Sequence, residues 1–162
     1  MQGVFFMKKY YIAIFLLLFV NFIPQKTTLI DISEDIGRGE YLFIVEGKQE
    51  KGEFSSVFYN GNTTILTCPS YKAREKKDTI KCRILSQSLS FLGVESDALD
   101  VIKKLDAKIV QKSKTGDILS YYLWSGSLDS ESVELFGEKV NMQIAITGGK
   151  VQIGIPILCG SY

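Results

Sequence analysis

The stretch from Val140 to Leu158 constrains the fold most, because it contains two alternating apolar runs separated by Gly148-Gly149. This is the pattern of a β-hairpin closed by a two-residue turn. With the glycines in the turn, position 146 pairs with 151, 144 with 153 and 142 with 155. All the large apolar side chains then lie on one face, whereas a slip of one residue would place them on opposite faces. The sequence therefore predicts both the hairpin and its register.

Pro156 lies inside the second run and limits how far the hairpin extends. In the predicted register, position 156 would donate its backbone N–H to Asn141. Proline has no N–H group to donate. We therefore expect regular pairing to stop near Ile155 and the segment Cys159–Tyr162 to turn away from the sheet.

The N-terminal segment combines Lys8-Lys9 with the apolar run Tyr10–Ile23, an arrangement typical of an export signal. The run is shorter than the about 20 residues of a comfortable transmembrane helix, yet no small-x-small cleavage site follows it. Residues 1–25 are therefore interpreted as a signal peptide or an uncleaved membrane anchor, starting at Met1 or Met7. Both interpretations predict an extracytoplasmic protein. It is secreted if the segment is cleaved, and it is anchored to the cell membrane through this segment if it is not. A buried helix of a soluble protein is the remaining alternative.

Residues 26–39 are mixed and polar, and we interpret them as a linker with room for a short helical turn. Residues 40–162 then form a single domain. The chain carries 19 basic and 18 acidic residues, and two of the basic ones are Lys8 and Lys9, so the domain is close to neutral. This balance argues against a nucleic-acid partner. The chain has no histidine, which removes the Ser-His and Cys-His nucleophile pairs and most catalytic zinc sites.

Alternating and β-branched segments within residues 40–162 predict an antiparallel sheet. One helix is predicted over 70–82, and another begins at Ser96 or Asp97 and ends near Leu105. The predicted fold class is therefore α+β, with about two helices packed on one sheet face and a hydrophobic N-terminal helix before them. The other strands are expected at Tyr41–Val45, Phe54–Tyr59, Thr63–Cys68, Leu85–Leu92, Ala107–Lys112, Ile118–Trp124 and Val133–Phe136.

The segment Pro69–Arg83 is strongly charged and offers a candidate patch for an anionic partner. Lipid headgroups or an anionic envelope polymer would suit it. The alternative is a solvated helix face, with Ser70 as the cap and Ala73 on the buried side. Mixed charge on a short amphipathic segment favours this alternative. The basic residues of the block are Lys72, Arg74, Lys76, Lys77, Lys81 and Arg83.

Three cysteines, Cys68, Cys82 and Cys159, leave at least one thiol outside any disulfide within the chain. A Cys68–Cys82 bond would close a loop of about 15 residues and stabilise the fold by about 3 kcal/mol. The helix predicted over 70–82 would instead hold these two residues about 18 Å apart. We favour the helix, which leaves both as packing or inert thiols. Cys159 is a candidate reactive thiol, although no histidine or CxxC motif activates it.

Carboxylate pairs are the other candidates for chemistry. Asp97 and Asp100 lie close in sequence, as do Glu131 and Glu134, but such a pair catalyses only where a cleft separates the two pKa values. The glycines show no GxGxxG or P-loop spacing. The sequence thus predicts no catalytic, cofactor-binding or metal-ligating residue, and no cofactor.

Four short segments resemble small exported proteins of Gram-positive, clostridia-like bacteria: KLDAKIV at Lys104–Val110, the aromatic strand Tyr121–Trp124, KVNMQIA at Lys139–Ala145 and GIPILCGSY at Gly154–Tyr162. They are also similar to the carboxy-terminal part of the YwmB family, described as TATA-box-binding-protein-like. The resemblance covers roughly residues 96–162 and implies a curved antiparallel sheet with helices on one face. It implies no DNA binding in an exported protein, and it assigns no catalytic residue.

Together these features predict a non-enzymatic binding or accessory domain at the bacterial cell envelope. Its surface would be the basic block or an exposed sheet face, and an envelope protein or an anionic polymer would be the partner. One alternative is a small enzyme that uses Cys159 or a carboxylate pair. Another is a structural protein that self-associates through a sheet edge.

Overall fold

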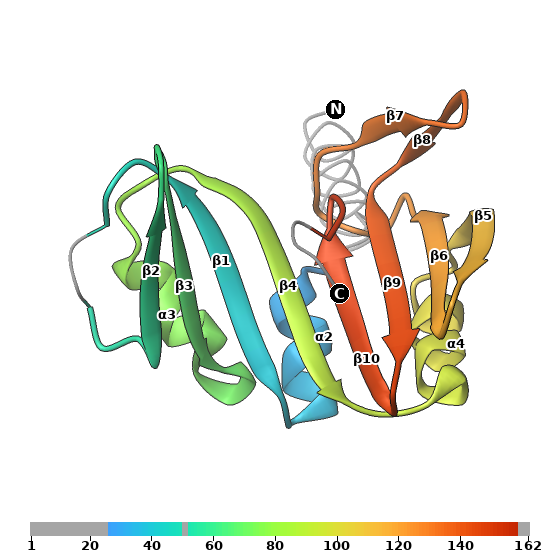
Figure 1. Ribbon diagram of the computed structural model, residues 1–162, viewed down its shortest axis with the longest axis horizontal. Helices are drawn as coiled ribbons and strands as arrows, with labels where there is room; N and C mark the ends of the chain where they lie inside the picture. The colour runs from blue at the N-terminus through green and yellow to red at the C-terminus, as the bar shows by residue number, and fades with distance from the viewer. Residues whose placement is uncertain (1–25, 50–51, 159–162) are drawn as a thin grey trace, which may run out of the picture.

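A computed structural model describes residues 26–49 and 52–158 of the chain (Figure 1). These residues form an eight-stranded antiparallel sheet, a separate two-stranded hairpin and three α-helices. The predicted α+β class with a large antiparallel sheet is confirmed, with three helices where about two were expected. The predicted N-terminal hydrophobic helix and the predicted turn at Cys159–Tyr162 lie outside the described residues.

The helices of the described residues are α2 (Leu29–Ile36), α3 (Ala73–Thr79) and α4 (Glu95–Lys104), with a 3₁₀ turn η1 (Ser70–Lys72) before α3. The strands of the large sheet are β1 (Glu40–Glu46), β2 (Ser56–Asn60), β3 (Thr63–Pro69), β4 (Ile84–Leu92), β5 (Lys108–Thr115), β6 (Ile118–Trp124), β9 (Met142–Thr147) and β10 (Lys150–Ile155). Their order is β2-β3-β1-β4-β10-β9-β6-β5. The hairpin of β7 (Val133–Leu135) and β8 (Glu138–Val140) is called the arm below.

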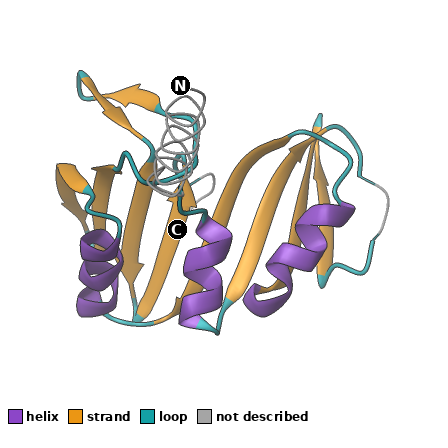
Figure 2. Cartoon of the chain, turned by 180° about the vertical axis from the view of Figure 1, so that it is seen from behind, coloured by secondary structure: helices purple, strands orange, loops and turns teal. Residues whose placement is uncertain are grey.

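The three helices lie against one face of the sheet, called the helix face, and the opposite face is called the open face (Figure 2). α2 contacts β4 and α3 contacts β3, whereas α4 contacts β9 and β10. The core fills the layer between the helices and the sheet. Its largest fully buried side chains include Tyr41, Phe43, Leu89, Tyr121, Ile144 and Ile153.

β9 and β10 form the predicted hairpin in the predicted register. Ile146 faces Val151 and Ile144 faces Ile153. Gly148 and Gly149 form the turn with φ angles of +55° and +75°, a left-handed backbone that glycine adopts without steric cost. The pairing of β9 with β10 ends at Gly154, one residue before β10 itself ends. Regular pairing therefore stops before Pro156, as its missing N–H predicts.

The predicted linker instead contains α2, and this part of the prediction is wrong. Leu29, Ile30 and Ile32 of α2 are buried in the core. The helix begins with a capping box, in which Asp31 N–H donates to the Thr28 hydroxyl at 3.2 Å and Thr28 N–H donates to the Asp31 carboxylate at 2.7 Å. Half of the eight residues of α2 are apolar, but its three acidic residues and the flanking threonines and glycines give the whole segment a mixed, polar pattern that is typical of a linker.

The helix predicted over 70–82 is present but shorter. α3 ends at Thr79, and Lys81 then donates its backbone N–H to the Gln49 side-chain oxygen at 3.2 Å. Ser70, the expected cap, lies in η1, where its buried hydroxyl has no hydrogen-bond partner among the described residues. The cap prediction is therefore wrong, because a 3₁₀ turn precedes the helix.

α4 begins at Glu95, slightly before the predicted start. Asp97 stabilises this end from the first turn, because its carboxylate accepts the Val94 backbone N–H at 2.7 Å. Lys103 and Lys104 lie in the last turn, as predicted from the helix dipole. No helix among the described residues has both the length and the apolar character needed to cross a bilayer.

The described chain begins at the end of the sheet from which the arm projects (Figure 1). Thr27 N–H donates to Ser127 O at 2.7 Å, and Asp129 N–H donates to Thr27 O at 2.8 Å. Ser127 and Asp129 belong to the loop between β6 and the arm, and the arm leads into β9. We call this end of the sheet the entry end.

The buried position of Leu29 can be tested by unfolding. Replacement of Leu29 by alanine is expected to lower the free energy of unfolding by about 2–5 kcal/mol, because it leaves a cavity between α2 and the sheet. Lys26→Ala is the control, since an exposed residue in the same segment is expected to change stability by no more than about 0.5 kcal/mol. Urea denaturation of the full-length variants measures both. Equal, small effects would mean that the segment is a linker after all.

Candidate functional site

A groove of about 380 Å³ lies between α2 and α4 on the helix face. It exists because the two helices pack on different strands and leave part of the sheet between them (Figure 2). The floor of the groove is apolar and includes Ile32, Phe91 and Val101, one from each of α2, β4 and α4. The rim carries charges of both signs. The rim residues are Asp35, Arg38, Asp97, Asp100 and Lys104.

The rim charges are partly paired. The Lys104 ammonium bonds to the Asp35 carboxylate, which joins α4 to α2, and Asp97 accepts the N–H that precedes α4. Arg38 and Asp100 form no ion pair with another residue of the described part of the chain. The groove has the size of a small ligand pocket. Its remaining charges suit a ligand with an apolar group beside a polar or charged one.

Arg74 of the basic block is an internal ion-pair partner. Its Nε lies 2.7 Å from Glu34 Oε1 and its Nη2 lies 2.7 Å from Asp31 Oδ1, so it joins α3 to α2. The hydrogen bond from Arg74 holds the pKa of Glu34 below its ordinary value. The pKa of Asp31 is also lowered, first by the Thr28 backbone N–H and then by Arg74. These contacts already use the guanidinium of Arg74, which the sequence offered as part of a candidate patch for an anionic partner.

Lys76 of the basic block is buried and only 3% exposed. Its ammonium lies 3.2 Å from a carboxylate oxygen of Glu53 and 3.2 Å from one of Glu75. The hydrogen bond to Glu53 raises the pKa of Lys76 and keeps it charged. A buried cation with two carboxylate partners offers little surface to a ligand.

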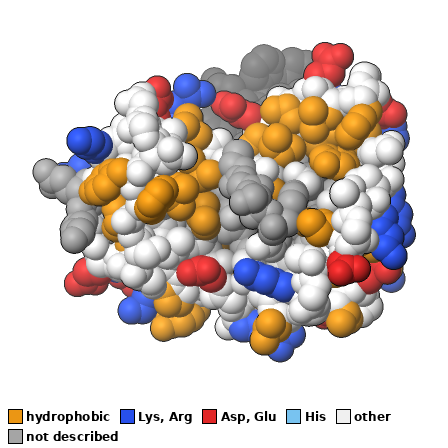
Figure 3. Space-filling view, viewed as in Figure 1, with side chains coloured by type: hydrophobic (Ala, Val, Ile, Leu, Met, Phe, Trp, Pro, Cys, Tyr) orange, Lys and Arg blue, Asp and Glu red, His pale blue; other side chains and the backbone are white. Residues whose placement is uncertain are grey.

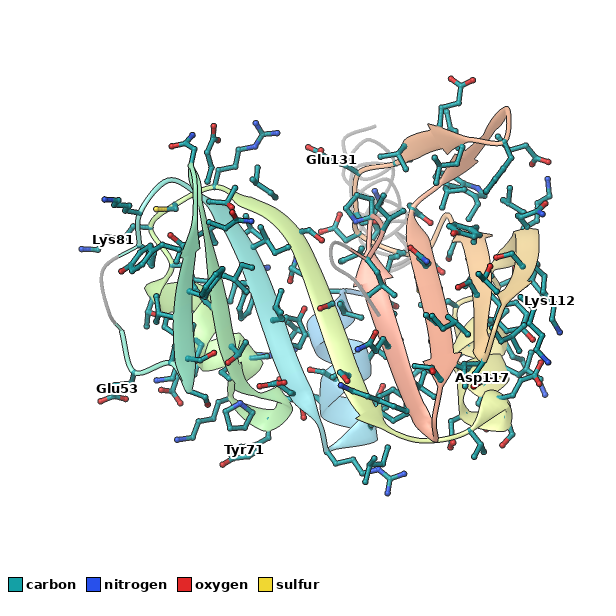
Figure 4. All side chains as sticks on the ribbon, viewed as in Figure 1. Glu53, Tyr71, Lys81, Lys112, Asp117 and Glu131 are labelled. Carbon is teal, nitrogen blue, oxygen red and sulfur yellow. The ribbon has the colours of Figure 1, made fainter. Side chains whose placement is uncertain are left out.

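The other cations of the block are spread along the molecule. Lys81 and Lys48 line a cavity of about 250 Å³, and Arg83 lies 3.9 Å from Glu131, in the loop that leads into the arm. Figure 4 shows Glu131 near the entry end and Tyr71, in η1, toward the opposite end. The remaining two cations, both exposed, are Lys72 and Lys77. The block thus contributes separate charges along α3 and beyond it, two of which are fixed by internal partners.

The described thiols are not placed for chemistry. Cys68 and Cys82 are both free, as the helix prediction requires. Burial raises the pKa of Cys68 to about 11, so this thiol stays protonated at neutral pH and is a poor nucleophile. Cys82 is half-buried, and its Sγ lies 3.8 Å from the Lys48 carbonyl oxygen. Cys159 lies outside the described residues and remains a prediction.

A cluster missed by the sequence analysis joins α4 to the β5 edge of the sheet. The Tyr121 hydroxyl donates to Glu95 Oε1, and the Lys112 ammonium lies 3.2 Å from the same oxygen and 4.9 Å from the Tyr121 ring centre. The bond from Tyr121 lowers the pKa of Glu95. Burial, followed by the bond to Glu95, raises the pKa of Tyr121. The contact between a protonated tyrosine and an ionised glutamate is therefore a structural one. Lys112 is exposed on the outer strand β5 (Figure 4).

The predicted carboxylate pairs are placed differently from each other. Asp97 and Asp100 both line the groove, whereas Glu131 precedes the arm and Glu134 lies in β7. No cluster of three or more potential metal ligands exists among the described residues. Of the two pairs, the groove therefore includes only the one on α4.

The two edges of the sheet differ in charge. β5 presents lysines and contains a register shift between Ile109 and Gln111; both features protect an edge from pairing with another chain. β2 has no charged residue, and its Phe58 is 62% exposed. Figure 3 shows apolar side chains gathered over β1–β3 and, separately, over the arm.

The groove could not have been found from the sequence. Its floor residues Ile32, Phe91 and Val101 come from segments far apart in the chain, and each fits the ordinary apolar pattern of its own element. No known protein family, curated protein or solved structure matches this chain. The resemblance to the YwmB family therefore stays a prediction.

The ion pairs of Arg74 predict how stability depends on pH. Both Asp31 and Glu34 have pKa values below their ordinary 3.8 and 4.5 in the folded state, so the unfolded chain binds more protons in acid. Their contribution to stability is present above those ordinary values and is lost as the pH falls through the lower folded values. Arg74→Gln removes the main cause of the lowered pKa of Glu34. The variant is expected to lose less stability than the parent between about pH 5 and pH 3.

Urea unfolding midpoints across this pH range measure the difference. Lys72→Gln is the matched control, because Lys72 is an exposed neighbour without an ion pair among the described residues. Its profile is expected to follow that of the parent chain. Parallel profiles for Arg74→Gln and the parent would contradict the assigned ion pairs.

Proposed function

We propose that this protein is a non-enzymatic, extracytoplasmic binding domain, tethered at the bacterial cell envelope by its N-terminal apolar segment. The groove between α2 and α4 is its binding site. The observation that carries the proposal is the combination of an apolar floor with a rim of both charge signs in one accessible groove. Such a surface suits a partner segment that buries an apolar side chain and places charged groups at the rim.

The unpaired rim charges indicate how the partner is oriented. Arg38 follows α2, and Asp100 lies on α4, so the two charges come from opposite walls of the groove. A partner segment with an acidic group near Arg38 and a basic group near Asp100 is favoured. An envelope protein supplies such a segment more readily than a uniformly anionic polymer does, because Arg74 and Lys76 already have carboxylate partners.

The tether rests on the sequence of the N-terminal segment. Lys8-Lys9 precede the apolar run Tyr10–Ile23, and no small-x-small site follows it. Basic residues on the N-terminal side favour a cytoplasmic N-terminus and an external domain. The resemblance to small exported proteins supports the same location.

The tether is tested by cell fractionation. The full-length species is expected in the membrane fraction, where detergent but not alkaline carbonate releases it, and its domain is expected to be digested by protease added outside the cell. Leu17→Arg places a charge at the centre of the run, which costs about 3 kcal/mol in insertion, and is expected to lower the membrane-bound share. Gln25→Arg, beyond the run, is the control. A shorter species in the medium would show that the segment is cleaved.

The groove is tested by site-specific photo-crosslinking in the producing cells. A photoreactive side chain at Arg38 is expected to give one adduct of defined mass. Val101→Trp in the floor is expected to reduce that adduct by about tenfold, because filling the groove removes one well-packed contact worth about 1.4 kcal/mol. Leu99, exposed on α4 and not among the residues that line the groove, is the control position. The same adduct from Leu99, or no effect of Val101→Trp, would contradict the proposed site.

A further inference from the structure

The arm carries an aromatic side chain that the stability of the fold does not explain. Its turn is Phe136-Gly137, with φ angles of +56° and +73°. Asparagine or glycine is usual at the first of these positions, and another residue in the left-handed region costs roughly 1–2 kcal/mol. The Phe136 ring meets Tyr122 edge-on at 5.2 Å between centres, yet Phe136 remains 62% exposed. A large apolar ring therefore projects from a turn that disfavours it.

The arm lies at the entry end, where the apolar N-terminal run joins the domain. Thr27 is hydrogen-bonded to Ser127 and Asp129 in the loop that precedes the arm. Three residue steps separate Ile23, the last residue of the run, from Lys26, and they span at most about 10 Å when extended. The three-residue strands of the arm extend about the same length. A bilayer that holds the run therefore lies within reach of the arm.

We infer that the tip of the arm, centred on Phe136, contacts the surface of the bilayer in which the N-terminal segment is anchored. This inference rests on the proposed tether. Aromatic rings are favoured at the boundary between lipid headgroups and acyl chains. The ring of Phe136 gains there the burial that the protein does not give it.

The charges near the arm indicate an apolar contact rather than an electrostatic one. Lys108 bonds to Glu138 of β8, and Arg83 lies close to Glu131 before β7. The arm itself carries Glu134, Glu138 and Lys139, so it lacks the basic excess that attracts anionic lipids. The contact is therefore expected to persist at high salt and in vesicles of zwitterionic lipid.

The contact determines how the domain sits on the membrane. With the tether and Phe136 both at the bilayer, the entry end faces the lipid. Leu92, at the other end of β4, then points into the aqueous space. Leu92 is 75% exposed and offers a matched apolar position away from the membrane.

Tryptophan quenching in vesicles tests this orientation. The full-length protein carries one native tryptophan, so Trp124→Phe gives a background into which Phe136→Trp or Leu92→Trp is introduced. Each variant is reconstituted into phosphatidylcholine vesicles that contain lipid with a nitroxide near the top of the acyl chain. Phe136→Trp is expected to be quenched by about twofold or more and to shift its emission to shorter wavelength, as an aromatic ring at the interface should. Leu92→Trp is expected to show neither change.

Flotation of the same samples separates the two proposals. Protein that floats with the vesicles while Phe136→Trp stays unquenched would overturn the arm contact and leave the tether intact. Equal quenching at both positions would also overturn it, because the domain would then have no fixed orientation. Protein that fails to float would overturn the tether and the arm contact together. Circular dichroism of each variant, compared with that of the Trp124→Phe background, checks that it is folded.

Discussion

The antiparallel pairing of β4 with β10 is the contact on which the rest of the structure depends. It is the one strand pairing, within the described residues, between the half of the sheet formed by β1–β4 and the half that follows α4. Its register runs from Leu92 opposite Lys150 to Gln87 opposite Ile155. Leu89 faces Ile153 across this junction, and both side chains are completely buried. Hydrogen bonds and apolar burial thus act together where the two halves meet.

The same junction explains where the groove lies. α2 belongs to the first half of the sheet and α4 to the second, so each helix packs over its own strands. Of the two junction strands, β4 is contacted by α2 and β10 by α4. Phe91 of β4 forms part of the groove floor between the two helices. The ion pair between Lys104 and Asp35 spans the space at its rim. A groove at the junction is therefore a consequence of joining two helix-covered halves through one pair of strands.

Sequence patterns predicted the local parts of this fold and missed the distant ones. The β9–β10 hairpin was predictable because its two strands are adjacent in the chain and its Gly-Gly turn has a specific chemistry. The pairing of β4 with β10 joins residues about sixty positions apart. Nothing in the sequence of either strand indicates which strand it pairs with. The groove could not be predicted for the same reason, since its floor comes from three segments that are far apart in the sequence. The basic block was visible as a composition, but the carboxylates that pair with Arg74 lie about forty residues earlier.

The open face differs from the helix face at this junction, because the chain covers it itself. Leu158 donates its backbone N–H to the Gln143 side-chain oxygen at 3.2 Å, and Ser86 donates its hydroxyl to Ile155 O at 3.1 Å. Gly154 lies beneath this segment, and a Cβ atom there would stand 2.6 Å from Leu158 N, so only glycine lets the chain fold back so closely. Residues 156–158 thus cover Gly154 on the open face, at the end of β10. Near the junction of the two halves, the helix face therefore has the groove with its apolar lining, which supports the groove over an exposed sheet face as the place where a partner binds.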